Sequence, residues 1–160
     1  MNASVIIKHI RELSGTLAPR ACLLGLDLGH KTIGMAISDD SRLIASPLDT
    51  IQRTKFTKDA EALLAVIPQY SVGGIILGLP INMDGSEGPR CQSTRQFGYN
   101  LTSKTDLPIG FWDERMSTQA MERHLIAQDV TRKRRAEVID KMAAHFILQG
   151  ALDFLRNMPD

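Results

Sequence analysis

The segment that most constrains the fold is a pair of apolar runs joined by a short turn, with a carboxylate near the end of the first run. The sequence L-L-G-L-D-L-G-H-K-T-I-G-M-A-I-S-D covers residues 23–39. Its first part is typical of a buried strand, and the alternation over 32–37 predicts a second strand that returns beside the first. Asp27 therefore lies where a core strand ends, and a carboxylate there needs a cation, hydrogen-bond donors or exposure. The simpler interpretation of this stretch alone is an ordinary acidic residue beside a turn.

The composition indicates a single domain without a dominant charge. The chain has 160 residues, of which 43% are hydrophobic, and a formal net charge of +1, so any affinity for nucleic acid must come from local clusters of charge. Cys22 and Cys91 have no partner at the spacing of a metal or redox motif, which favours free thiols in a reducing compartment. We find no pattern typical of a signal peptide or a membrane span. We therefore expect a cytoplasmic protein that does not associate with membranes.

The order of apolar patterns predicts an α/β fold. We expect residues 1–20 to form an N-terminal extension, either a packed helix or a mobile arm, and residues 21–158 to form one domain. The expected strands cover 23–26, 32–37, 42–48, 73–80 and 107–112; the expected helices cover 57–68, a segment through 97 and 101, a segment from 117 to 125, and 138–155. Three neighbouring strands with short turns predict an antiparallel meander, and the later alternation of helix and strand predicts parallel strands. The pattern indicates a mixed five-stranded sheet flanked by helices.

Three carboxylates stand at comparable places. Asp27 follows the first strand, Glu114 and its neighbour Asp113 follow the fifth, and Asp140 lies in an otherwise apolar part of the C-terminal helix. If the first and fifth strands lie close together and the last helix packs across them, the acids converge. Hard oxygen ligands suit Mg²⁺ or Mn²⁺, which would polarise a phosphate and activate water. Alternatively, Glu114 starts a helix and Asp140 is a surface residue.

Four motifs together resemble the YqgF/RuvX family of the RNase H-like superfamily, whose members are described as Holliday junction resolvases and as pre-16S rRNA nucleases. They are L-G-L-D-L-G-H-K-T-I-G-M-A-I-S-D, I-I-L-G-L-P-I-N-M-D-G-S-E-G, W-D-E-R-M-S-T and V-I-D-K-M-A-A-H-F-I-L-Q-G-A-L, and the resemblance covers residues 22–156. It implies an RNase H-like nuclease domain over 21–158, with Asp27, Glu114 and Asp140 as the catalytic, metal-binding triad. Whether Asp113 or Glu114 is the ligand stays open. Lys141, directly after Asp140, departs from the family pattern.

Five further residues are candidates for binding the substrate. Lys31 lies in the first turn, Asn82 in the glycine-rich loop, and Arg115 directly after Glu114, whereas Arg132 and Arg134 belong to a basic run before the last helix. Cations beside a carboxylate site suit a phosphate backbone, and the loop offers donors ahead of a helix. The alternatives are a solubilising lysine, an ordinary turn, an ion pair of Arg115 with Asp113, and a solvated basic run.

The resemblance predicts a hydrolase that cleaves phosphodiester bonds with Mg²⁺ or Mn²⁺. Maturation of the 16S rRNA precursor in ribosome biogenesis is its expected setting, and ribosomal particles are candidate partners. The alternatives are a DNA resolvase of the Holliday junction type and a module that binds nucleic acid or a ribosomal partner without cleaving. The first motif also resembles the phosphate-binding hairpin of actin-like ATPases, but 160 residues leave no room for their two lobes. The sequence leaves open a monomer or a homodimer, and endonuclease or exonuclease action.

Overall fold

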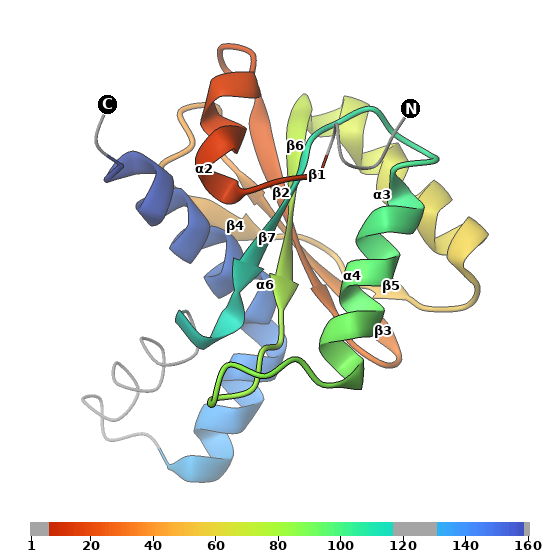
Figure 1. Cartoon of the computed structure of the whole chain (residues 1–160), viewed down its shortest axis with the longest axis vertical. Helices are drawn as coiled ribbons and strands as arrows, with labels where there is room; N and C mark the ends of the chain where they lie inside the picture. Colours follow the sequence, from red (N-terminus) through yellow and green to blue (C-terminus); the bar gives the residue numbers. More distant parts are fainter. Residues whose placement is uncertain (1–6, 117–130, 159–160) are drawn as a thin grey trace.

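One mixed sheet lies between two layers of helices (Figure 1). The computed structural model describes residues 7–116 and 131–158, with the backbone alone at 7–8 and 132–141. In chain order the elements are β1 (Ile7–Lys8), α2 (Ile10–Leu13), the 3-10 turn η1 (Ser14–Thr16), β2 (Cys22–Leu28), β3 (Thr32–Ser38), β4 (Ala45–Pro47), β5 (Ile51–Gln52), α3 (Phe56–Tyr70), β6 (Val72–Leu79), α4 (Pro89–Leu101), β7 (Ile109–Asp113) and α6 (Arg132–Arg156).

The sheet has the predicted mixture of antiparallel and parallel strands. Its order is β1-β7-β6-β2-β3-β4, and β5 pairs with β3. The β2–β3 and β3–β4 pairs are antiparallel, whereas β2–β6 and β6–β7 are parallel. The five expected strands are confirmed, and two strands of two residues each, β1 and β5, extend the sheet to seven. Such short strands carry too few residues for a period-2 pattern, which is why the sequence did not indicate them.

Alternation along β2 assigns its side chains to two different cores. Leu24, Leu26 and Leu28 pack in the cluster that includes residues of α3 and α4, whereas Leu23 packs in the cluster that includes α6 and α2. Since side chains two apart in a strand share a face, Asp27 lies on the same face as Leu23, the face that α6 covers. The strand therefore presents one carboxylate toward the layer formed by the C-terminal helix.

Glycines on the strands let α6 approach the sheet closely. A Cβ atom placed on Gly25 would lie 2.7 Å from Leu148 Cβ, and one placed on Gly78 would lie 2.5 Å from Ile147 Cδ1. A larger residue at Gly25 would push the helix away from the sheet, because a Cβ atom cannot rotate aside, whereas one at Gly78 would displace the flexible end of the Ile147 side chain. The helix therefore packs directly over β2 and β6, with Ala144 and Leu148 of α6 against Gly25 of β2.

The N-terminal residues that the structure describes pack on the domain. Strand β1 pairs in parallel with β7, and the His9 side chain accepts a hydrogen bond from the Arg11 backbone N–H at the start of α2. Ile10 and Leu13 are buried in the cluster that contains Trp112. The described part of the N-terminal segment thus packs against the sheet and the cluster on its α6 side.

Two details of the predicted helices need comment. The basic run does not precede the last helix, because α6 begins at Arg132 and the run forms its first turn; lysine and arginine are good helix formers, so the helix extends through them. The helix expected from 117 to 125 lies outside the described residues. In the part of the chain that the structure covers, no helix is both long and apolar enough to span a bilayer.

Candidate active site

Two of the three predicted acids lie at the same edge of the sheet. Asp27 is the penultimate residue of β2, and Glu114 directly follows the last residue of β7. Strand β6 lies between them and is parallel to both, so all three strands end at one edge. A Cβ atom on Gly78 of β6 would lie only 3.0 Å from Glu114 Cγ, which places the Glu114 side chain over this glycine. The lack of a side chain at Gly78 is what admits Glu114 beside the end of β2.

The environment of Glu114 disfavours its charged form. Burial raises its pKa, and the negative charges of Asp27 and Asp113 raise it further, whereas Arg90 lowers it; the resulting pKa is about 7 rather than the usual 4.5. Two carboxylates close together cannot both ionise without cost. A cation between Asp27 and Glu114 would remove this repulsion, and a raised carboxyl pKa in such a position is typical of functional sites.

Asp113 is engaged differently from its neighbour. Arg115 Nη2 donates to Asp113 Oδ2 at 2.7 Å, Arg115 Nε donates to Oδ1 at 3.1 Å and to Oδ2 at 3.0 Å, and the Arg115 backbone N–H donates to Oδ1 at 2.9 Å. Partial burial raises the pKa of Asp113, but the hydrogen bonds from Arg115 outweigh this effect and lower it overall. The Asp113 carboxylate is therefore ionised and held by its own cation, two residues along the chain.

The same arginine connects the strand end to the glycine-rich loop. Arg115 Nη1 donates to the backbone oxygens of Asn82 at 3.4 Å and Met83 at 3.5 Å. Within the loop, Asn82 Nδ2 donates to Ser86 Oγ at 3.0 Å, and Gly85 has a φ of 90°, a left-handed conformation that favours glycine. The loop is thus a structured turn beside Asp113 and Glu114, and Asn82, which pairs with Ser86 across the base of the turn, is exposed.

The third predicted acid lies on the helix that packs over Asp27. Position 140 precedes Ala144 by four residues, one turn of α6. A Cβ atom on Gly34, the β3 partner of Asp27, would lie 3.6 Å from Ala144 Cβ and 3.7 Å from Asp27 Cβ. The backbone of α6 therefore brings position 140 to the neighbourhood of the β2 end. Among the side chains that the structure describes, no three His, Cys, Asp or Glu residues gather in a metal-binding arrangement.

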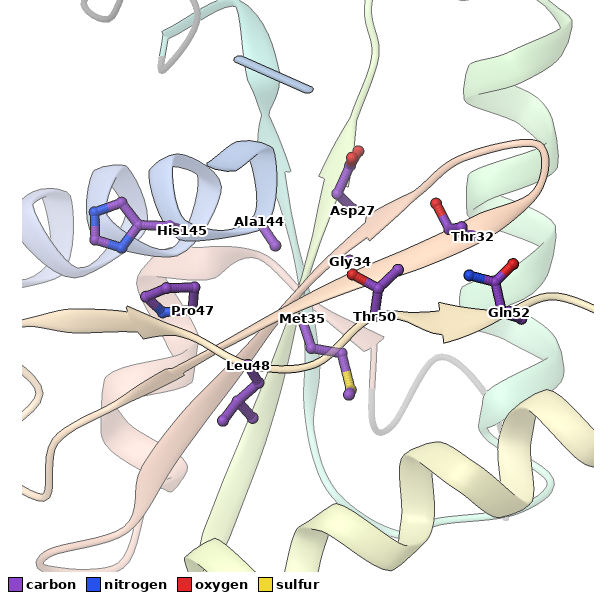
Figure 2. A pocket seen from close by; sticks show the side chains of 10 residues that line it. All are labelled: Asp27, Thr32, Gly34, Met35, Pro47, Leu48, Thr50, Gln52, Ala144 and His145. Carbon is purple, nitrogen blue, oxygen red and sulfur yellow. The ribbon is translucent and has the colours of Figure 1, made fainter. Parts of the chain in front are cut away.

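A cavity opens beside Asp27. It has a volume of ≈ 380 Å³, and Figure 2 shows Asp27 at the end of β2 with Ala144 and His145 of α6 on one side and Thr32 and Gln52 on the other. The remaining lining residues are Gly34, Met35, Pro47, Leu48 and Thr50. The carboxylate thus borders a cavity whose lining combines apolar side chains with several hydrogen-bonding groups.

The predicted substrate-binding residues Lys31, Arg132 and Arg134 lie on two different elements. Lys31 is exposed in the β2–β3 turn, where its backbone oxygen accepts a hydrogen bond from the Arg53 backbone N–H at 2.8 Å. Arg132 and Arg134 lie in the first turn of α6, two turns before position 140. Sequence reasoning did not single out Arg90, whose charge acts on Glu114. Its only sequence signal is its place at the start of α4, directly after the glycine-rich loop, and the sheet order is needed to bring it beside Glu114.

The arrangement of the sheet and helices defines a fold class. An antiparallel meander followed by parallel strands, with helices on both faces of the sheet, is an RNase H-like fold. The model of the RuvX family, described as Holliday junction resolvase, matches residues 21–154. The chain belongs to this family, which confirms the resemblance seen in its four motifs.

Relatives and a solved structure agree with this assignment. A protein of Ruegeria pomeroyi is 58% identical over 154 residues, which cover 96% of this chain and 100% of the relative, and one of Paramagnetospirillum magneticum is 63% identical over 142 residues, which cover 89% and 92%. Both carry the name "Putative pre-16S rRNA nuclease". The structure of T. thermophilus RuvC in complex with a Holliday junction substrate aligns with a TM-score of 0.55 at 10% identity, over 86% of this chain and 96% of that one. This last likeness concerns the fold.

Proposed function

We propose that this chain is a divalent-metal-dependent nuclease that hydrolyses phosphodiester bonds in the precursor of 16S rRNA. The observation that carries the proposal is the position of Asp27 and Glu114 at one sheet edge, near enough for the charge of one to raise the pKa of the other. The name that the relatives share supports the substrate, and the family supports the class of reaction. The nuclease domain would span residues 21–158, with 1–20 as an N-terminal extension that joins its sheet through β1.

The proposed catalytic residues are Asp27, Glu114 and Asp140, which would hold Mg²⁺ or Mn²⁺. Carboxylate oxygens are the ligands that these ions prefer, and a cation bound between Asp27 and Glu114 would relieve the repulsion between them. A bound ion would polarise the scissile phosphate and lower the pKa of the attacking water. Glu114 fits this role better than Asp113, because Arg115 already neutralises Asp113.

The other polar residues would orient the nucleic acid. Lys31, Arg132 and Arg134 would contact phosphates, and Asn82 would donate to the sugar or the backbone. Arg115 would act mainly by fixing Asp113 and the loop that carries Asn82, with its outer N–H groups turned to a phosphate. We expect the protein to act in the cytoplasm on ribosomal precursor particles, as a monomer or a homodimer.

The test compares three labelled substrates: precursor 16S rRNA, an unrelated single-stranded RNA and a four-way DNA junction. Each is incubated with Mg²⁺, Mn²⁺ or EDTA and with the wild type, Asp27→Asn or Asp40→Asn. Asp40 is an exposed acid in the turn after β3 and serves as the matched control. We expect cleavage of the precursor with either ion, its loss in EDTA, and its loss in Asp27→Asn with RNA binding retained.

Each alternative gives a different result. Preferred cleavage of the junction would replace the ribosomal substrate by a DNA junction, the activity that the family description names. Binding of RNA without cleavage under every metal condition would favour a docking module. Unchanged cleavage by Asp27→Asn would overturn the assignment of the acids, and equal losses in Asp40→Asn would point to a general effect of removing charge.

A further inference from the structure

A second cavity lies on the other side of the β2 end, and its charge is opposite to that of the acid site. Its volume is ≈ 460 Å³, and it lies between the β2–β3 turn and the first turn of α4, which adjoin in Figure 1. The lining residues are Leu28, Gly29, His30, Arg53, Pro89, Arg90, Ser93 and Thr94. The described residues that line it include two arginines and no carboxylate.

Both arginines are anchored on the two residues that directly follow Asp27. Arg90 Nη2 donates to the backbone oxygen of Leu28 at 3.4 Å, and Arg53 Nη1 donates to the backbone oxygen of Gly29 at 2.6 Å. The chain thus passes from Asp27 straight into the wall of the basic cavity. A group bound between the arginines would lie close to the acids, because the anchoring residues directly follow Asp27 in the chain. The charge of Arg90 also acts on Glu114.

Arg53 is held in a fixed position with donors to spare. Its guanidinium lies 6.0 Å from the centre of the Phe97 ring, and its Nε lies 4.0 Å from Oδ2 of the buried Asp59. Among the described residues, its side chain makes one hydrogen bond, to Gly29, although a guanidinium has five N–H donors. An arginine that is already ordered loses little entropy when it binds a ligand, and its planar fork matches the oxygens of a phosphate.

Arg90 supplies a second cation, and no carboxylate among the described residues forms an ion pair with it. It is exposed, and within the described part of the chain it has no ion pair within 4.0 Å. Ser93, three residues further along α4, is also exposed, and its hydroxyl makes no hydrogen bond to any described residue. These groups offer charge and donors to an anion, whereas Thr94 is buried and donates to the Arg90 backbone oxygen at 3.0 Å.

We propose that this basic cavity binds a phosphate of the substrate strand next to the scissile one, with Arg90 and Arg53 as its ligands. The inference rests on the proposed function, since it assigns part of the nucleic-acid path of that site. Two guanidiniums with no lining carboxylate favour an anion over a base, and the anion that a polynucleotide carries at every linkage is phosphate. The cavity therefore counteracts the repulsion that Asp27 and Glu114 exert on an approaching strand.

The test measures binding in EDTA, so that it does not depend on cleavage. The probe is a fluorescent single-stranded RNA, and the dissociation constant is measured at several salt concentrations for the wild type, Arg90→Gln, Arg53→Lys and Arg156→Gln. Arg156 is the matched control, an exposed arginine paired with Asp153 at the far end of α6. Lysine is chosen at position 53 because the buried Asp59 needs a nearby cation.

We expect Arg90→Gln to weaken binding about tenfold, as the loss of a charge-assisted hydrogen bond does, and to reduce the salt slope by about 0.7, the value for one phosphate contact on a single strand. Arg53→Lys keeps the charge and should weaken binding with a nearly unchanged slope, because lysine cannot bind a phosphate bidentately. Arg156→Gln should match the wild type. Unchanged binding by Arg90→Gln, or equal weakening by Arg156→Gln, would overturn the proposal.

A second probe identifies the bound group. In a series of strands, one linkage at a time is replaced by a neutral methylphosphonate. Replacement at one particular linkage should weaken binding by the wild type about tenfold and binding by Arg90→Gln much less. If no single replacement weakens binding by the wild type in this way, the cavity does not hold a single phosphate. A failure of the nuclease proposal is seen separately, as the absence of metal-dependent cleavage by the wild type, and it leaves these binding results intact.

Discussion

The charge of Asp27 acts on Glu114 across Gly78, the strand residue whose missing side chain makes room for Glu114. Gly78 follows Leu77 in β6, which is paired with Leu26 of β2, and so it lies in the row of the sheet that contains Asp27. Burial and the charge of Asp27 together raise the pKa of Glu114 to about 7. The ionisation of the two acids is therefore coupled, and near neutral pH the protonation of Glu114 depends on any cation that binds between them.

The first prediction concerns stability in the absence of divalent metal. Because the pKa of Glu114 is about 7 in the folded protein and 4.5 for the free side chain, the folded state binds more protons between these values, and its stability falls as pH rises from 4.5 to 7. Glu114→Gln removes this penalty. In EDTA at pH 8 the variant should be more stable than the wild type by about 1–3 kcal/mol, and at pH 4 the two should be alike.

Chemical denaturation at both pH values measures the difference. Glu61→Gln, an exposed change on α3, is the control and should leave stability unchanged at either pH. A stability gain of equal size at pH 4 and pH 8 would contradict the electrostatic explanation, because it would not depend on ionisation of Glu114.

The second prediction concerns the pH dependence of metal binding. A carboxyl with a pKa of about 7 must lose its proton before it can coordinate a cation. Below pH 7, the affinity for Mg²⁺ or Mn²⁺ should fall by up to about tenfold per pH unit, and binding should release a proton. Calorimetry in two buffers of different ionisation enthalpy measures the released proton. Glu114→Asp should keep the proton release, whereas binding without any proton release in the wild type would contradict the role of Glu114.

The third prediction separates Glu114 from its neighbour Asp113. Glu114→Gln should lower cleavage by more than about a hundredfold, since even residues that only orient metal ligands contribute about 10–100-fold. Asp113→Asn keeps the shape of the side chain and loses the ion pair with Arg115. This pair is partly exposed, since the Asp113 side chain is 27% exposed and the Arg115 side chain 30%. It should reduce cleavage less than tenfold and cost about 1 kcal/mol or less of stability. The reverse order of the two activities would make Asp113 the ligand.

Much of this architecture could be predicted from the sequence because it rests on local patterns. The β2–β3 hairpin, the buried strand β6 and the long helix α6 each carry a clear period, and their order restricts the topology. The two-residue strands β1 and β5 could not be predicted, since their pairing depends on neighbours far along the chain. Likewise, Arg53 and Arg90 come together only because both donate to backbone oxygens at the end of β2, and no spacing in the sequence encodes that. The sequence left open whether Arg115 pairs with Asp113 or binds a phosphate, and only the geometry could show its ion pair with Asp113.

The fourth prediction tests the close packing of α6 on β2. In Gly25→Ala, the new Cβ would lie 2.7 Å from Leu148 Cβ, and neither atom can rotate away. The helix must shift, so the change should cost about 1–3 kcal/mol in the free energy of unfolding. Gly15→Ala is the matched control, because nothing lies within 4 Å of its added Cβ, and it should be neutral or slightly stabilising. Equal stability of the Gly25→Ala variant and the wild type in urea denaturation would show that α6 does not depend on this contact.

The fifth prediction uses Gly78 to displace Glu114 without altering either acid. In Gly78→Ala, the added Cβ would lie 2.5 Å from Ile147 Cδ1 and 3.0 Å from Glu114 Cγ. The Ile147 methyl is the far end of a flexible side chain and can turn aside, and the Glu114 side chain must shift away from its place over the glycine. We therefore expect the affinity for Mn²⁺ to fall about 10–100-fold with a smaller loss of stability than in Gly25→Ala. Metal titration and urea denaturation of both variants measure the two effects, and unchanged metal affinity in Gly78→Ala would show that the position of Glu114 over this glycine is not required for metal binding.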